Sequence, residues 1–190
     1  NPDFDFIERF APDTSNSLNY GGNLEVVPPH TTPGGTLYSW GRILVGGGSS
    51  FKIGTTTTTT RYSDILQREF FNACVLQGTH LQSSTEWLAV GHVDEYLCFV
   101  PAPATSRGWV LALGNPNTAK TILQNVSATG GGAKTVFAGR TGWQTTVDAI
   151  LANTALMTFN NEVQIRIDSV RAYLKAQIGL ADSEIIAVPV

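Results

Sequence analysis

The stretch Trp87-Leu88-Ala89-Val90-Gly91-His92-Val93-Asp94-Glu95-Tyr96-Leu97-Cys98-Phe99-Val100 places a histidine and two carboxylates inside an otherwise apolar run. Aromatic and aliphatic residues of this kind favour pleated, half-buried surfaces, so the pattern predicts a strand over residues 85–100. Successive side chains of a strand point to opposite faces. The prediction therefore places on one face His92, Asp94, Tyr96 and Cys98, and on the other Val93, Glu95, Leu97 and Phe99.

On such a strand, His92 and Asp94 lie roughly 7 Å apart along the backbone, so their polar ends can converge on one ligand. A carboxylate beside an imidazole suits a positively charged ligand. In the alternative interpretation, the two side chains hydrogen-bond to each other or to nearby backbone groups and have a structural role. The residues themselves leave both interpretations open.

The chain contains two cysteines, Cys74 and Cys98. This number excludes a disulfide-rich scaffold and a zinc site built from four cysteines. Cys98 follows His92 by a distance on the order of 20 Å along an extended strand. Since a thiol nucleophile and its base must be within hydrogen-bonding reach, Cys98 is not expected to be the partner of His92. We expect both cysteines to act as small apolar filling residues.

The composition is that of a globular protein, because 42% of the 190 residues are hydrophobic. The net charge of -3 and the pI near 5.5 provide no broad attraction to nucleic acid or to an anionic membrane. The sequence contains no apolar run of about 18 residues, which is the length that predicts a membrane span. The first residues lack the basic and apolar regions of a signal peptide. The absence of an initiator methionine suggests a fragment or a processed product.

Periodicity along the chain predicts an α/β protein. Apolar residues at three- and four-residue spacing predict amphipathic helices over residues 61–77 and 159–178, with Gly78 and Gly179 as stop signals. Shorter patterns predict helices at 117–126 and 145–151, and strands at 22–27, 38–45, 108–113, 135–137 and 185–188. The order β-β-α-β-β-α-(β)-α-α-β contains a strand–strand–helix–strand motif twice. Residues 46–50 and the threonine run 55–60 are expected to form a mobile surface connection.

Glu25 follows Gly21-Gly22-Asn23-Leu24 at the start of the first predicted strand. Its carboxylate and nearby backbone carbonyls are oxygen ligands of the kind that a hard cation such as calcium prefers. A solvated surface glutamate explains the same residues. Both interpretations of Glu25 stay open at this point.

Four blocks of the sequence carry a family resemblance: GNLEVVPP at residues 22–29, GRIL at 41–44, EWLAVGHVDEYLCFVPAP at 86–103 and GLADSEII at 179–186. Their order and approximate spacing resemble the C-terminal catalytic domain of protein-arginine deiminases, and Pro2-Asp3-Phe4 extends the resemblance to nearly the whole chain. The resemblance implies the α/β propeller of guanidine-modifying, pentein-like enzymes, with five strand-rich blades around a central site. Residues 1–190 are then a single segment of that catalytic domain, incomplete at both ends and comprising about two ββαβ modules.

The resemblance also implies a reaction. In this family a cysteine thiolate attacks the guanidinium carbon of a peptidyl arginine, ammonia leaves, and water then releases citrulline. His92 matches the general acid and base, and Asp94 matches one of the two carboxylates that hold the planar guanidinium. Glu95 is expected to be a supporting or structural group. Calcium is implied as a cofactor, with ligands from the Glu25 carboxylate and the carbonyls of Gly21 and Leu24.

The same resemblance implies that the rest of the active site lies outside these residues. The second aspartate and a substrate-binding arginine belong before Pro2, and the nucleophilic cysteine belongs after Ile186, so we expect no deiminase activity from residues 1–190 alone. Two alternatives stay open, namely a catalytically dead module that binds guanidinium groups and a deiminase of a small guanidine such as free arginine or agmatine.

The expected partners follow from this assignment. They are an arginine-containing protein or peptide as substrate, and either the remainder of the catalytic domain or a second copy of the chain, because an incomplete propeller exposes strand edges. No nucleic acid or membrane partner is expected. The family suggests a cytoplasmic location, while the glycosylation sequon Asn125-Val126-Ser127 is compatible with secretion.

Overall fold

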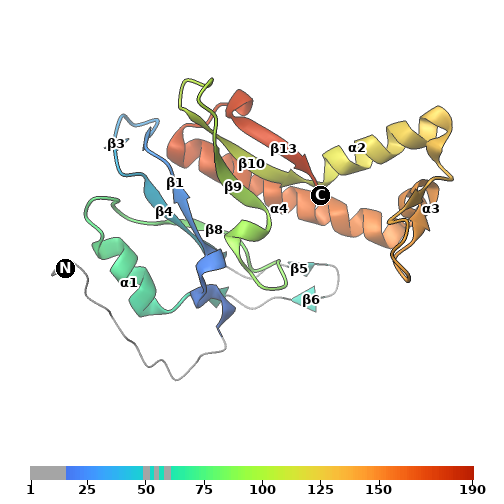
Figure 1. Cartoon of the computed structure of the whole chain (residues 1–190). Coiled ribbons are helices and arrows are strands. Elements are labelled where there is room, and N and C mark those ends of the chain that lie inside the picture. Colours follow the sequence, from blue (N-terminus) through green and yellow to red (C-terminus); the bar gives the residue numbers. More distant parts are fainter. Residues whose placement is uncertain (1–15, 49–51, 54–55, 58–60) are drawn as a thin grey trace.

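The first sheet is built around β4 (Arg42–Gly48). The structure is a computed structural model that describes residues 16–48, 52–53, 56–57 and 61–190. β1 (Leu24–Val27) and β7 (Arg61–Tyr62) pair antiparallel with β4, and β8 (Leu81–Ser83) pairs parallel with it. Helix α1 (Ile65–Ala73) lies between β7 and β8 in the chain, and Figure 1 shows it at the opposite end of the molecule from α2 (Pro116–Val126) and α3 (Val147–Ala152).

The second sheet repeats this order of pairing. Its central strand is β10 (Trp109–Asn115), which pairs antiparallel with β9 (Leu97–Pro101) and parallel with β13 (Ile185–Pro189). Between β10 and β13 the chain forms α2 (Pro116–Val126), α3 (Val147–Ala152) and α4 (Thr154–Ile178). The chain is thus a mixed α/β protein, as predicted, in which a ββαβ order occurs twice.

Three short hairpins complete the described elements. They are β2 (His30–Thr31) with β3 (Leu37–Tyr38), β5 (Lys52–Ile53) with β6 (Thr56–Thr57), and β11 (Thr135–Val136) with β12 (Thr145–Thr146). Single turns of 3-10 helix lie at Ser17–Asn19 (η1), Gly21–Asn23 (η2), Val93–Glu95 (η3) and Asp182–Glu184 (η5), and a π-helical turn lies at Ser127–Gly131 (η4).

The helices begin and end where the side chains provide caps. The Asn115 side chain accepts a hydrogen bond from the Thr118 N–H at the start of α2, and Pro116 occupies the first turn. Helix α4 ends at Gly179, which adopts the left-handed conformation with φ 71° and donates its N–H to the Lys175 carbonyl. These caps confirm the predicted helix near residues 117–126 and the stop at Gly179.

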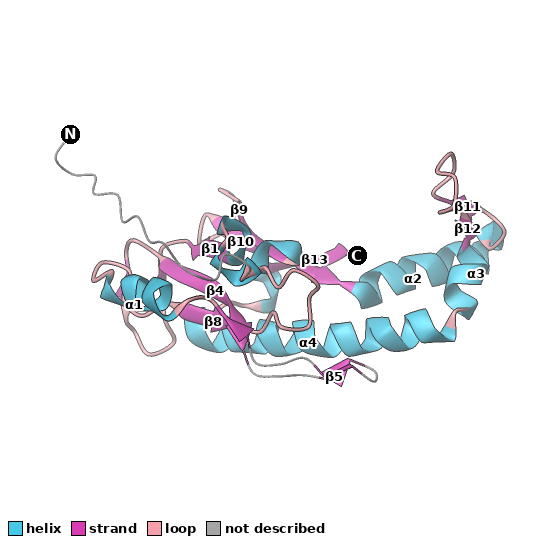
Figure 2. Cartoon of the chain, turned by 90° about the horizontal axis from the view of Figure 1, so that it is seen from below, coloured by secondary structure: helices cyan, strands magenta, loops and turns pink. Residues whose placement is uncertain are grey.

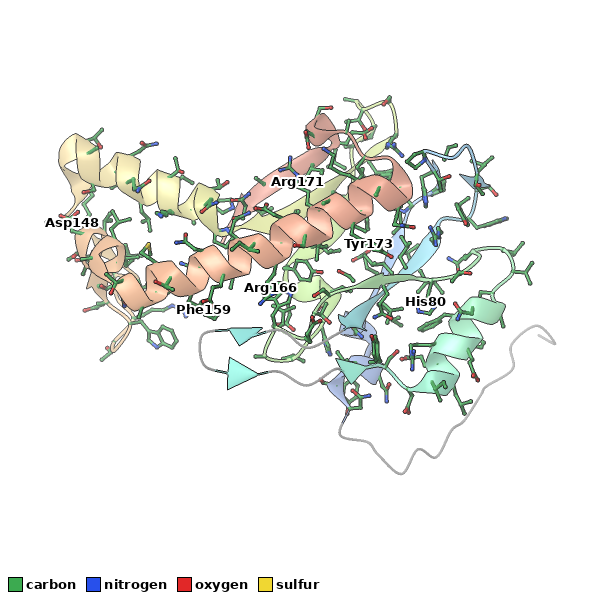
Figure 3. All side chains as sticks on the ribbon, turned by 180° about the vertical axis from the view of Figure 1, so that it is seen from behind. His80, Asp148, Phe159, Arg166, Arg171 and Tyr173 are labelled. Carbon is green, nitrogen blue, oxygen red and sulfur yellow. The ribbon has the colours of Figure 1, made fainter. Side chains whose placement is uncertain are left out.

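Helix α4 runs along both sheets (Figure 2), and its buried residues share one apolar core with them. Its buried residues Ile167, Val170, Leu174 and Ile178 belong to one apolar cluster with residues of both sheets, including Val27, Leu44, Leu81, Leu97, Trp109, Leu111 and Leu113. Tyr173 reaches from α4 to β8, where its hydroxyl accepts a hydrogen bond from the Gln82 N–H at 3.2 Å (Figure 3). In the part of the chain that the structure describes, no helix is long and apolar enough to cross a membrane.

The strand predicted over residues 85–100 is wrong for most of its length. β8 ends at Ser83, β9 begins only at Leu97, and turns with η3 lie between them. The reason is local, because Gly91 has a φ of 92° that breaks the extended conformation. The strand face that was predicted to carry both His92 and Asp94 is therefore absent, because these residues lie in and beside η3.

The glycine run was also predicted incorrectly. Gly46 and Gly47 are buried in β4, which continues to Gly48, instead of forming a mobile connection. A side chain on Gly46 would overlap with the side chains of Asn23 and Thr85, so this position needs glycine for packing. Residues 49–50 of the predicted connection and most of the threonine run lie outside the described residues, except for β6. The helix predicted over 61–77 is shorter than expected, since it occupies Ile65–Ala73.

Candidate functional site

The His92 ring is held by a backbone group that is far away in the sequence. Its Nε2 atom lies 2.7 Å from the carbonyl oxygen of Ser17 in η1. A carbonyl oxygen only accepts hydrogen bonds, so Nε2 carries the proton in this bond. The side chain is 15% exposed. Burial and this bond together fix the ring, and they leave Nδ1 as the ring nitrogen that can accept a proton.

The turn that presents His92 is closed by Glu95. Gly91 is in the left-handed conformation, which glycine adopts without strain. The Glu95 Oε1 atom accepts hydrogen bonds from the backbone N–H groups of Gly91 and His92, at 2.9 and 2.8 Å. Glu95 thus stabilises the turn before β9, which is a structural role.

Asp94 lies beside His92 at the surface. Its Oδ1 atom is 3.9 Å from His92 Nδ1, and its side chain is 55% exposed. The ring nitrogen that is not bonded to Ser17 therefore faces a carboxylate that is open to solvent. The structure brings together the two side chains that the sequence analysis grouped, although it presents them from a turn and not from a strand.

Gly22 lies directly against both of these side chains. A methyl group on Gly22 would lie 2.5 Å from His92 Nδ1 and 2.7 Å from Asp94 Oδ2, distances that are too short for van der Waals contact. A methyl group on the neighbouring Gly21 would have no other atom within 4 Å. His92 and Asp94 can therefore approach each other only because position 22 is a glycine. The sequence patterns did not indicate this role of Gly22.

Glu25 adds a second carboxylate near Asp94. Burial raises the pKa of Glu25, and the negative charge of Asp94 raises it further. A hydrogen bond that Glu25 Oε1 accepts from the Val26 N–H at 3.2 Å partly opposes this rise. Two interacting carboxylates and an imidazole form an arrangement that suits a cation with several N–H donors.

A family model described as protein-arginine deiminase (PAD) matches residues 1–190. The chain belongs to the protein-arginine deiminase family. It is 38% identical over 192 residues to protein-arginine deiminase type-3 of Rattus norvegicus, in an alignment that covers 98% of this chain and 28% of the relative. The identity is 36% over 190 residues to type-1 of Homo sapiens and 35% over 189 residues to type-4 of Mus musculus, each covering 99% of this chain and 27% of the relative. These matches confirm the resemblance seen in the four sequence blocks, and the chain spans little more than a quarter of the length of these deiminases.

The calcium ligands implied by the deiminase resemblance lie close together but supply few oxygens. Gly21 begins η2 and Glu25 lies in β1, and the Gly21 carbonyl already accepts a hydrogen bond from the Leu24 N–H. Within the described ranges, no group of three or more histidine, cysteine, aspartate or glutamate side chains is placed to hold a metal ion. Calcium takes about six to eight oxygen ligands. One carboxylate and two carbonyls do not meet that requirement.

Neither cysteine of this deiminase-family chain contacts His92 among the described hydrogen bonds. Cys98 is a free, exposed thiol on β9. The expectation that it fills the core is wrong, because the alternation in β9 turns Leu97 and Phe99 toward the core and Cys98 outward. Cys74 is partly exposed just after α1, and its Sγ donates to the Phe70 carbonyl at 3.4 Å. The expectation that Cys98 is not the partner of His92 stays a prediction.

Proposed function

We propose that this chain provides the His92–Asp94 side of a site that binds the guanidinium group of an arginine-containing protein or peptide and hydrolyses it to citrulline and ammonia. The observation that supports this proposal most directly is the meeting of His92 Nδ1 and the exposed Asp94 carboxylate over Gly22. The relatives are named protein-arginine deiminases, and these names support the same reaction.

The chemistry follows from the two groups. An ionised Asp94 accepts two N–H bonds from the planar guanidinium and holds its carbon in place. A cysteine thiolate, from a part of the protein beyond these residues, adds to that carbon. The imidazolium of His92 gives its Nδ1 proton to the departing ammonia, and the neutral imidazole then takes a proton from the water that displaces the thiolate.

The proposed architecture is a partial five-bladed α/β propeller. It is supported by the common pairing order of β1-β4-β8 and β9-β10-β13, in which the third strand of each set is parallel to the second. Each set corresponds to one ββαβ module. The outer edge of β13 has no partner strand among the described residues, and it offers a place for the remainder of the domain or a second copy of the chain. A cytoplasmic location stays a prediction.

Binding of a peptidyl-arginine mimic, acetyl-L-arginine methylamide, tests the proposal without requiring turnover. We expect Asp94→Asn to weaken binding about tenfold, since a hydrogen bond to a charged group contributes about 1.5–3 kcal/mol and Asp94 is partly solvated. Glu69→Gln is the matched control, because Glu69 is an exposed carboxylate on α1. Calorimetry that finds the same affinity for the citrulline analogue, or no change in Asp94→Asn, contradicts the proposed site.

Activity of the isolated chain separates catalysis from binding alone. Since neither thiol is hydrogen-bonded to His92 among the described residues, we expect residues 1–190 to bind the guanidinium without releasing citrulline. Citrulline release that His92→Ala abolishes would overturn this expectation. Binding of free arginine or agmatine as tight as that of the blocked mimic would favour a small-guanidine site, and binding without turnover even in the longer protein would favour a catalytically dead module.

Calcium at Gly21, Leu24 and Glu25 is part of the proposal only as a weak site. Because these residues supply too few oxygens, we expect them to bind calcium with a dissociation constant no tighter than about 1 mM. Calorimetric titration of the chain with calcium chloride, with Glu25→Gln as the comparison, checks this value. Micromolar binding that depends on Glu25 would show that further ligands complete the site.

A further inference from the structure

Turn η1 is tied to the His92 turn by two hydrogen bonds that involve the same residue. The Ser17 carbonyl accepts from His92 Nε2 at 2.7 Å. The Ser17 hydroxyl donates to the Val90 carbonyl at 2.6 Å, just before Gly91. Ser17 thus holds both the ring of His92 and the backbone that leads into it.

Turn η1 is itself anchored to the first sheet. The Asn16 side chain accepts from the Leu18 N–H at 3.2 Å and donates to the Tyr62 carbonyl at 2.9 Å. The fully buried Asn23 side chain donates to the carbonyls of Leu18 and Gly46, at 2.8 and 3.1 Å. These bonds fix the position of the Ser17 carbonyl independently of the turn that carries His92.

Packing reinforces this arrangement. Leu18 is 1% exposed, and its Cδ2 atom would lie 2.8 Å from a methyl group on Gly91. The Leu18 side chain therefore fills the space under Gly91. Turn η1 cannot shift toward the His92 turn without a clash, and it cannot move away without breaking the Ser17 bonds.

We infer that η1 is a positioning element for His92: the Ser17 carbonyl fixes the proton on Nε2, so Nδ1 is the ring atom that exchanges protons beside Asp94. The catalytic meaning of this inference rests on the proposed function, whereas its geometry does not. Ser17 acts through His92 and touches no reacting atom, so it is a positioning residue.

The other histidines provide an internal comparison. The sequence contains three histidines. The His30 Nδ1 atom lies 2.8 Å from the Pro28 carbonyl, which requires the proton on Nδ1, and its buried Nε2 has no partner in the described part of the chain. In His80, Nδ1 lies 2.7 Å from the Asn72 side-chain oxygen. The structure therefore assigns opposite neutral forms to His92 and His30 within one protein.

Nitrogen-15 NMR of the ring nitrogens tests the inference on the 190-residue chain, at a pH where the rings are neutral. We expect a single protonated Nε2 in His92, with a slowly exchanging proton, and a protonated Nδ1 in His30. A His92 proton on Nδ1, or an Nε2 proton that exchanges as fast as that of a free imidazole, overturns the inference.

Variants of Ser17 separate positioning from folding. We expect Ser17→Ala, which loses the bond to Val90, to speed exchange of the His92 Nε2 proton at least tenfold, and Ser17→Thr, which keeps the hydroxyl, to restore slow exchange. The His30 signal should not change in either variant, and backbone amide spectra report whether each variant folds. Equal exchange rates in wild type and Ser17→Ala would show that the hydroxyl bond to Val90 does not help to hold His92, which contradicts this part of the inference.

Different results would contradict the proposed function and the positioning role of η1. If the acetyl-arginine mimic binds but the His92 proton is on Nδ1, the proposed function stands and the positioning role of η1 is wrong. If the proton is on Nε2 and slowly exchanging but the mimic does not bind, η1 orients His92 as inferred and the proposed function is wrong.

Discussion

Gly22→Ala tests whether the His92–Asp94 pair depends on the space at this position. The added methyl group would lie 2.5 Å from His92 Nδ1 and 2.7 Å from Asp94 Oδ2. Favourable contacts between non-bonded heavy atoms are about 3.5–4.0 Å long, so each group must move by about 1 Å. Asp94 can move into solvent because it is 55% exposed, whereas the His92 ring is largely buried and bonded to Ser17.

The expected loss of stability follows from the displacement of the His92 ring. Moving His92 weakens its bond to the Ser17 carbonyl, which contributes about 0.5–1.5 kcal/mol net. Overpacking of a filled site usually costs about 1–3 kcal/mol. We therefore expect Gly22→Ala to lower the free energy of unfolding by about 1–3 kcal/mol relative to Gly21→Ala. The same change should weaken binding of the arginine mimic at least tenfold, since Nδ1 and the Asp94 carboxylate no longer meet.

Gly21→Ala is the matched control, because nothing lies within 4 Å of its added methyl group. Both replacements reduce the flexibility of the unfolded chain to a similar extent, so the difference between them isolates the contact with His92 and Asp94. Urea unfolding followed by fluorescence of the buried Trp87 and Trp109 measures this difference. Equal stability and equal affinity in the two variants would refute the role assigned to Gly22.

Three further predictions concern stability. Leu174→Ala should lower the free energy of unfolding by about 2–5 kcal/mol, because Leu174 is fully buried in α4. Ile165→Ala, on the exposed side of the same helix, should lower it by less than about 1 kcal/mol. Thermal unfolding measures both, and similar losses would argue against the shared core. Glu95→Ala should cost about 1.5–3 kcal/mol through loss of two charge-assisted hydrogen bonds and should broaden the amide signals of the turn before β9; a variant as stable as wild type would contradict this. Burial and the charge of Asp94 raise the pKa of Glu25, so the folded state binds more protons than the unfolded state between the ordinary and the raised pKa, and stability should fall as pH rises through that window. Carbon-13 NMR should show that Asp94→Asn lowers the pKa of Glu25 without removing the larger effect of burial; an unchanged pKa would mean that the two carboxylates do not interact.

Most of the secondary structure could be predicted from local patterns. Helix α4 shows apolar residues at helical spacing and ends at a glycine, and α2 begins with an asparagine cap followed by proline. These signals are local, because capping and one-sided burial involve residues within a few positions of one another. The strand predicted over residues 85–100 is confirmed only at 97–100, where β9 lies, because Gly91 and Glu95 close a turn before it.

Sequence alone grouped His92 with Asp94 as a site for a cation, and the family resemblance assigned that cation to arginine. The two side chains do meet, since residues so close in the chain remain neighbours in a turn as well as in a strand. Tertiary structure decided the surroundings: Ser17 binds one ring nitrogen, Gly22 leaves room for the other, and Glu25 adds a second carboxylate. These groups lie some 70 residues earlier in the chain, and their contacts depend on how η1, η2 and β1 pack against the turn before β9. No local pattern encodes such packing, and for that reason the protonated nitrogen of His92 follows from the structure and not from the sequence.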